Sequence, residues 1–137
     1  MSRKEVVVIP CSGIGKSLGS VSREAAYQLC ETLRPDRTQL VALSKLVLGE
    51  EEARGRVRNN PAVTIDGCKQ MCAAKLVRHS GGTIAREVAV FEVFRRYKGL
   101  QPEGIAELNA EGKQLARALA EEIAVDIDEI AEGGAHA

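Results

Sequence analysis

The sequence has few aromatic residues: of its 137 residues, two are Phe, two are Tyr and none is Trp. Apolar residues nevertheless make up 45% of the chain and charged residues 28%, which is close to average globular usage and excludes a disordered or low-complexity chain. A chain of this length typically buries about two-thirds of its unfolded-state surface, so it can form a core without disulfides. We therefore expect one domain over residues 1–137, with a core of aliphatic side chains.

The chain also lacks an excess of charge, because 19 Lys and Arg balance 19 Asp and Glu. This balance argues against the broad basic surface that binds nucleic acid through its phosphates. The longest aliphatic run near the N-terminus, Val6–Ile9, is too short for a signal peptide or a membrane span. We therefore expect a cytoplasmic protein that binds neither nucleic acid nor membrane. In that reducing compartment its four Cys are expected to be thiols, metal ligands or redox groups rather than disulfides.

Strand and helix patterns alternate along the chain. The predicted strands cover Val6–Ile9, Gln39–Leu43, Ala62–Ile65 and part of Thr83–Phe94, with Val88 and Val90 at the centre of the last. The predicted helices run from Ser20 as N-cap to Pro35, through a glycine-interrupted stretch up to Asn59, over Cys68–His79 and over Asn109–Ile130. This alternation predicts an α/β, Rossmann-like fold with three layers, in which helices cover both faces of a mainly parallel sheet of about four strands.

The candidate site follows from the expected strand order 2-1-3-4. This order would reverse between the first and third strands, and α/β folds form their sites at the carboxyl ends of the strands beside such a reversal. Two unusual loops follow these strands: a glycine-rich loop over Pro10–Ser17 and a loop from Asp66 to Cys72. We expect these two Cys-bearing loops to face one cleft.

The spacing of the cysteines indicates which of them could share a ligand. Cys68 and Cys72 are four residues apart on a predicted helix, which places them on one face about 6 Å apart. Cys11 lies at the neighbouring strand end, so the three thiols would suit one tetrahedral zinc ion. Asp66 would either cap the helix or support the ion through a ligand. Cys30 shares the buried stripe of its own helix about 15 Å from this edge, so we expect it in the core.

The glycine-rich loop is similar to two nucleotide-binding patterns and matches neither. Gly15-Lys16-Ser17 has the tail of a P-loop, but Pro10 stands where that pattern requires Gly. The spacing of the glycines also differs from the dinucleotide-binding fingerprint. Two interpretations remain: a tight turn, or a seat for a small anion formed by Gly13, Gly15, Lys16 and Ser17.

Three motifs together resemble the DGC-domain family, which is named for a central Asp-Gly-Cys motif. They are Pro10–Lys16, Ser22–Tyr27, and Asp66-Gly67-Cys68 with Cys72-Ala73. The resemblance spans Pro10 to about Lys75 and implies zinc binding, because the family carries four potential chelating cysteines.

By this resemblance Cys11, Cys68 and Cys72 match family cysteines, whereas Ser44 stands where the fourth is expected. The resemblance therefore implies an incomplete ligand set. Three thiolates with a fourth position left to water, a small anion or a thiol ligand would resemble an open zinc site.

Two other classes of function stay open. A thiol redox enzyme or sulfur carrier would use Cys68 or Cys11 as a metal-free thiolate, because a thiolate near a helix N-terminus is stabilised there. A binding module would use the glycine-rich loop to hold an anion or a partner protein. No Ser, His and Asp constellation indicates a hydrolytic triad, so the sequence predicts no particular reaction.

Overall fold

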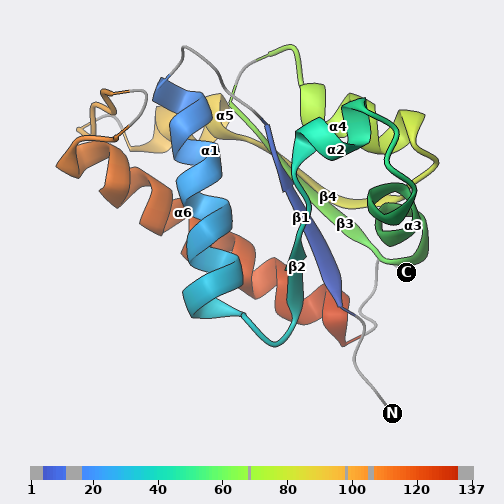
Figure 1. Cartoon of the computed structure of the whole chain (residues 1–137). Coiled ribbons are helices and arrows are strands. Elements are labelled where there is room, and N and C mark those ends of the chain that lie inside the picture. The colour runs from blue at the N-terminus through green and yellow to red at the C-terminus, as the bar shows by residue number, and fades with distance from the viewer. Residues whose placement is uncertain (1–4, 12–16, 68, 98, 105–106, 133–137) are drawn as a thin grey trace.

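A parallel four-stranded sheet forms the centre of the computed structural model, which describes residues 5–11, 17–67, 69–97, 99–104 and 107–132. The strands are β1 (Val6–Pro10), β2 (Thr38–Leu40), β3 (Ala62–Asp66) and β4 (Ile84–Ala89). They lie in the order β2-β1-β3-β4, and every neighbouring pair is parallel (Figure 1). The α/β fold class, the strand order and the reversal between β1 and β3 are therefore confirmed.

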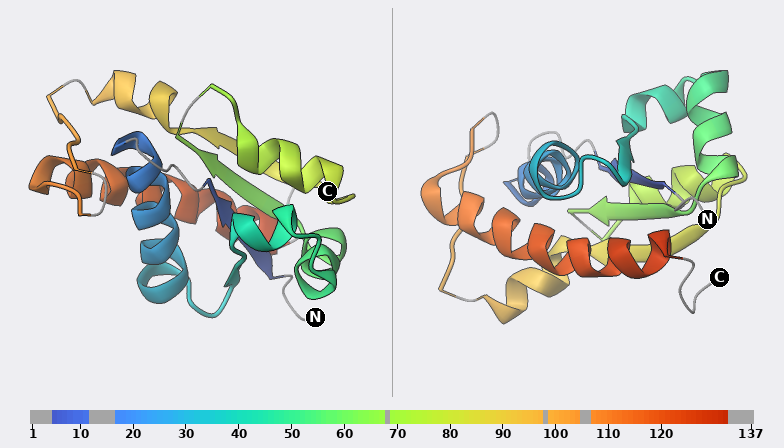
Figure 2. Two further views of the ribbon diagram at one scale, coloured as in Figure 1. Left: turned by 45° about the horizontal axis from the view of Figure 1, so that its top comes forward. Right: turned by 90° about the horizontal axis from the view of Figure 1, so that it is seen from below.

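Helices cover both faces of the sheet (Figures 1 and 2). One face packs against α1 (Ser17–Gln28), its π-helical continuation η1 (Leu29–Leu33), α5 (Val90–Arg96) and α6 (Ala110–Ala131). The other packs against α2 (Leu43–Val47), α3 (Glu51–Asn59) and α4 (Cys72–His79). Of the helices in the described ranges, none has the length and apolar character needed to cross a membrane.

The position of β1 inside the sheet explains why its sequence is a continuous run of β-branched residues. Val6 and Val8 belong to the core on the α1 and α6 side, while Val7 and Ile9 belong to the core on the α2, α3 and α4 side. All four side chains are fully buried. A central strand covered on both faces needs an apolar residue at every position, so period-two alternation is lost.

Two predicted element boundaries in the N-terminal half of the chain are wrong. Helix α1 begins at Ser17, so Ser20 lies inside its first turn and is not the N-cap. Strand β2 ends at Leu40, because Leu43 already begins α2. The helical stretch that follows is broken at Gly49, whose positive φ of 72° ends α2 and separates it from α3.

The fourth strand is also shorter than its apolar pattern predicts. It ends at Ala89, and Val90, predicted at the strand centre, is instead the first residue of α5. Val90 and Val93 are buried in the main core, three residues apart on one helical face. A short apolar run does not distinguish a strand from a buried helical turn by periodicity, and tertiary packing decides between them here.

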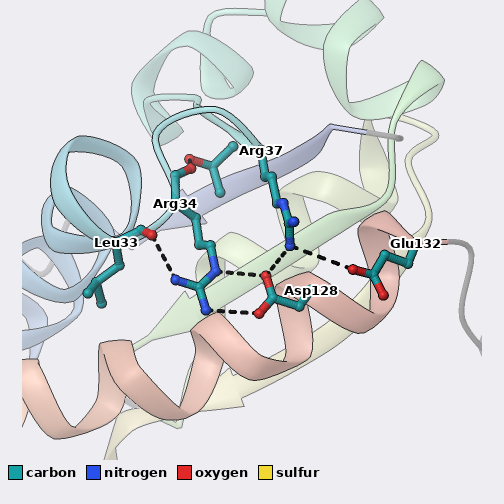
Figure 3. Close-up of polar contacts among 6 residues, drawn as sticks. Leu33, Arg34, Arg37, Asp128 and Glu132 are labelled. Atoms are coloured by element: carbon teal, nitrogen blue, oxygen red, sulfur yellow. Dashed lines mark hydrogen bonds and ion pairs between the residues drawn. The ribbon is translucent and has the colours of Figure 1, made fainter. Parts of the chain in front are cut away.

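The long helix α6 is fixed at both ends. Asn109, the first residue of the predicted helix, is instead its N-cap, and the Asn109 Oδ1 accepts a hydrogen bond of 2.8 Å from the Gly112 N–H. Near the other end, Asp128 accepts two hydrogen bonds from Arg34, at 2.7 and 2.8 Å, and one from Arg37 (Figure 3). These contacts tie α6 to the connection between η1 and β2.

Candidate functional site

The candidate site begins at Cys11, directly after β1 at the carboxyl edge of the sheet. Its backbone N–H donates to the carbonyl oxygen of Ile65 in β3 at 2.9 Å, so β1 and β3 stay paired to this point. The side chain is 7% exposed. Its Sγ accepts a hydrogen bond of 3.2 Å from the Gly67 N–H and lies 3.3 Å from the Ser22 Oγ. The two strand ends that the sequence predicts to converge are therefore in direct contact.

Ser22 links this sulfur to helix α1. The Ser22 side chain is fully buried, and its hydroxyl donates to the Gly19 carbonyl at 2.6 Å. A serine hydroxyl has one proton, so in this arrangement the Ser22 oxygen is free to accept from a Cys11 thiol. If the sulfur is ionised, rotation of the same hydroxyl would give it a second donor beside Gly67.

Gly67 lies against the backbone of α1 more closely than any other residue type could. A Cβ added there would stand 2.7 Å from the Gly19 nitrogen and 2.8 Å from the Leu18 carbonyl carbon and oxygen. These are backbone atoms, which a rotamer change cannot move away. The glycine of the Asp-Gly-Cys motif is therefore required by close packing between the loop and the first turn of α1.

Asp66 fixes the beginning of α4 across the loop. It is 1% exposed, and its Oδ1 and Oδ2 accept hydrogen bonds from the N–H groups of Ala73 (2.8 Å) and Ala74 (3.1 Å). Burial raises the pKa of Asp66, and the two backbone bonds oppose that rise only in part. Asp66 thus caps α4, one of its two predicted interpretations. The other, support of a bound ion, stays a prediction.

The predicted helix over Cys68–His79 is wrong at its start. Helix α4 begins at Cys72, and the preceding Met71 has a left-handed φ of 53°, which a helical turn does not contain. Lys69 and Gln70 form a turn that lies outside any helix. The argument that Cys68 and Cys72 share a helical face is therefore wrong.

The structure describes two of the three proposed zinc ligands, Cys11 and Cys72. Cys72 is half-buried and packs against the apolar cluster that contains Cys11. Cys68 lies outside the described residues, as do Gly13, Gly15 and Lys16 of the proposed anion seat. Among the residues that the structure describes, no three His, Cys, Asp or Glu side chains gather as metal ligands.

The structure also describes three further residues considered from the sequence: Ser17, Ser44 and Cys30. Ser17 is the first residue of α1, and Ser44 is an exposed residue in α2 rather than the end of a strand. Cys30 lies in η1, where burial raises its pKa more than the interaction with Thr38 lowers it. Thr38 pairs with Val6 at the opposite end of β1 from the candidate site. Cys30 is half-buried against the main core, apart from the site residues that are described.

A cavity of about 490 Å³ opens beside Gly67 at the same edge of the sheet. Phe91 and Phe94 of α5 line it together with Leu18 of α1 and Lys69 of the loop. The sequence pattern does not predict this cavity, because it indicates a strand within Thr83–Phe94 and no helix there. The three-residue spacing of Phe91 and Phe94 was the available signal, since it puts both rings on one helical face.

A family model described as the DGC domain matches residues 7–111, which is more than half of the chain. The match runs from β1 into the first turn of α6 and contains the Cys11, Asp66, Gly67 and Cys72 positions described above. Searches of curated proteins and of solved structures give no match to this chain. The family match therefore shows that the chain belongs to the DGC-domain family.

Proposed function

We propose that this DGC domain binds one zinc ion through Cys11, Cys68 and Cys72, with the fourth position open to water, a small anion or a thiol ligand. The hydrogen bond from the Gly67 N–H to the Cys11 Sγ carries the proposal. Cys68 follows Gly67 directly in the sequence, and consecutive Cα atoms are about 3.8 Å apart, which supports the inclusion of Cys68 in this ligand set.

The position of Cys72 supports the same ligand set. It is the first residue of α4, and Asp66 ties that helix end to the carboxyl end of β3. Cys72 also packs against the cluster to which Cys11 belongs. The Asp66 side chain, which is not a proposed zinc ligand, thus holds the Cys72 backbone near the strand ends.

The chemistry of the donor groups suits zinc. Three cysteine sulfurs form a soft ligand set, which favours zinc over magnesium or calcium. The Gly67 N–H already donates to one of these sulfurs and would stabilise its negative charge when ionised. A zinc ion held in this way would supply a Lewis acid at its open position.

Metal analysis of purified protein tests the proposal. Protein produced in zinc-supplemented medium and purified under reducing conditions is expected to carry close to one equivalent. Cys11→Ser, Cys68→Ser and Cys72→Ser should each remove most of it, and Cys30→Ser, the matched control, should retain it. Because the ligands must be deprotonated, retention should also weaken as the pH falls.

Two results would contradict zinc binding at these residues. One is wild-type protein without metal at neutral pH. The other is equal metal loss in Cys30→Ser and in the three site variants, with circular dichroism showing that all remain folded. In the second case the metal would depend on the fold and not on the proposed ligands.

A metal-free thiol function is the second candidate, because the contacts of Cys11 also suit a thiolate. The Gly67 N–H points at its sulfur, and the Ser22 hydroxyl is 3.3 Å away. On this alternative, metal-free protein would react with a small alkylating reagent at Cys68 or at Cys11, and more slowly at Cys11 because its side chain is only 7% exposed. Ser22→Ala would slow the reaction at Cys11, whereas Ser44→Ala, a matched change on exposed α2, would not.

A further inference from the structure

We propose that the cavity beside Gly67 binds a small organic monoanion with an aromatic or branched apolar body and one carboxylate. The cavity has a volume of about 490 Å³, within the range of small-molecule sites in proteins. Described side chains of α1, α5 and two loops form its lining. The proposal goes beyond zinc binding and does not depend on it, because none of these side chains is a proposed metal ligand.

The apolar side of the cavity is unusual for this chain. The sequence contains only two Phe, and both line the cavity from α5. The largest fully buried side chains among the described residues are instead Ile, Leu and Val. Phe91 and Phe94 are only half-buried, although aromatic rings provide the largest apolar surface available to a core. Leu18 and Pro102 complete this apolar wall, which fits a ring or a branched hydrocarbon.

The polar side of the cavity indicates the charge of the ligand. Lys69 is the only charged residue among the described lining residues, and it is exposed, so its ammonium group remains free to reorient. Ser17 and Gln101 supply neutral polar groups. Because the described lining holds one cation and no acidic side chain, it favours a ligand with a single negative charge. A carboxylate therefore fits better than a phosphate dianion.

Three ring compounds with different charges test this assignment: phenylacetate, neutral phenylacetamide and cationic phenethylamine. The protein has no Trp, so backbone amide NMR signals are the suitable readout. We expect phenylacetate at millimolar concentration to shift the signals of Leu18, Gly67 and Phe91 saturably. Phenylacetamide should bind about two- to fivefold more weakly, the range of one exposed ion pair, and phenethylamine more weakly still.

Matched variants separate the two sides of the cavity. Lys69→Gln should remove the preference for phenylacetate over phenylacetamide, while Lys75→Gln, an exposed lysine of α4 outside the lining, should keep it. Phe91→Ala should weaken all three compounds about tenfold. Tyr27→Ala, which truncates an exposed ring of α1 outside the lining, should not.

The proposal is overturned if no compound shifts these signals saturably, if the three compounds bind equally, or if Lys69→Gln and Lys75→Gln behave alike. Zinc content is measured in the same samples. Zinc-free protein that binds phenylacetate would contradict only the proposed zinc site. Zinc-loaded protein that binds none of the compounds would contradict only the carboxylate site.

Discussion

Replacement of Gly67 by Ala tests the close packing between the Asp-Gly-Cys loop and helix α1. The added methyl carbon would stand 2.7 Å from the Gly19 nitrogen and 2.8 Å from two Leu18 backbone atoms. Non-bonded carbon atoms prefer separations of about 3.5–4.0 Å, so the loop or the first turn of α1 must move by several tenths of an ångström or more. Gly67 is not among the glycines with positive φ, so the substitution adds a steric contact without backbone strain.

We expect Gly67→Ala to lower the free energy of unfolding by about 1.3 kcal/mol, the difference between two opposing effects. Overpacking a close-packed site typically costs about 1–3 kcal/mol. The lower conformational entropy of the unfolded alanine chain returns about 0.4–1 kcal/mol of that cost. The displaced loop would also weaken the bond from the Gly67 N–H to the Cys11 Sγ, so zinc retention should fall in the same variant.

Gly55→Ala is the matched control, since it adds the same methyl group where it meets no atom within 4 Å. Gly55 lies inside α3, where alanine is favoured over glycine by about 0.5–1 kcal/mol, so this variant should be more stable than wild type. Urea unfolding followed by far-UV circular dichroism measures both changes. A Gly67→Ala protein within about 0.5 kcal/mol of wild type, the usual range for surface substitutions, would refute the packing argument.

Two further predictions concern a buried carboxylate, Asp66, and a half-buried one, Asp128. Asp66→Ala leaves the N–H groups of Ala73 and Ala74 without their acceptors, so we expect a loss of about 2 kcal/mol in urea unfolding; a loss below about 0.5 kcal/mol would show that water replaces the cap. Hydrogen bonding to Arg34 holds the pKa of Asp128 below its ordinary value, so this ion pair stabilises the fold at neutral pH; its contribution begins to fall below about pH 4 and is lost as the pH passes through the lower pKa of the folded state. Asp128→Asn should therefore cost about 1 kcal/mol at pH 7 and progressively less as the pH falls below about 4, and a cost that does not change with pH would contradict the ion-pair explanation.

The strands of the sheet and their parallel arrangement were predictable because they depend on hydrophobic patterns that are local in the sequence. The run Val6–Ile9 indicates a strand covered on both faces, and the alternation of strands with helices limits the topology to a parallel sheet. The observed order β2-β1-β3-β4 then brings Cys11 and Gly67 together at one edge. The general location of the candidate site was therefore available from the sequence.

The path from β3 to α4 could not be predicted from local pattern. The spacing of Cys68 and Cys72 is compatible with a helical turn, but Asp66 reaches forward to Ala73 and Ala74, and α4 begins only at Cys72. Asp66 lies six residues before the first residue of α4. The sequence patterns that usually indicate a helix cap do not include a carboxylate at that distance. Only the folded chain shows that this cap, and not the cysteine spacing, sets the start of the helix.

The sequence by itself determined the aliphatic core, the parallel sheet and the motif residues at its carboxyl edge, because each depends on residue type and short-range periodicity. Tertiary structure alone decided that Val90 begins a helix, that Gly67 packs against the α1 backbone, and that both Phe side chains face a cavity. These features join segments far apart in the chain: the start of α1, the loop after β3 and helix α5. Their contacts arise from packing between elements, which no local sequence pattern encodes.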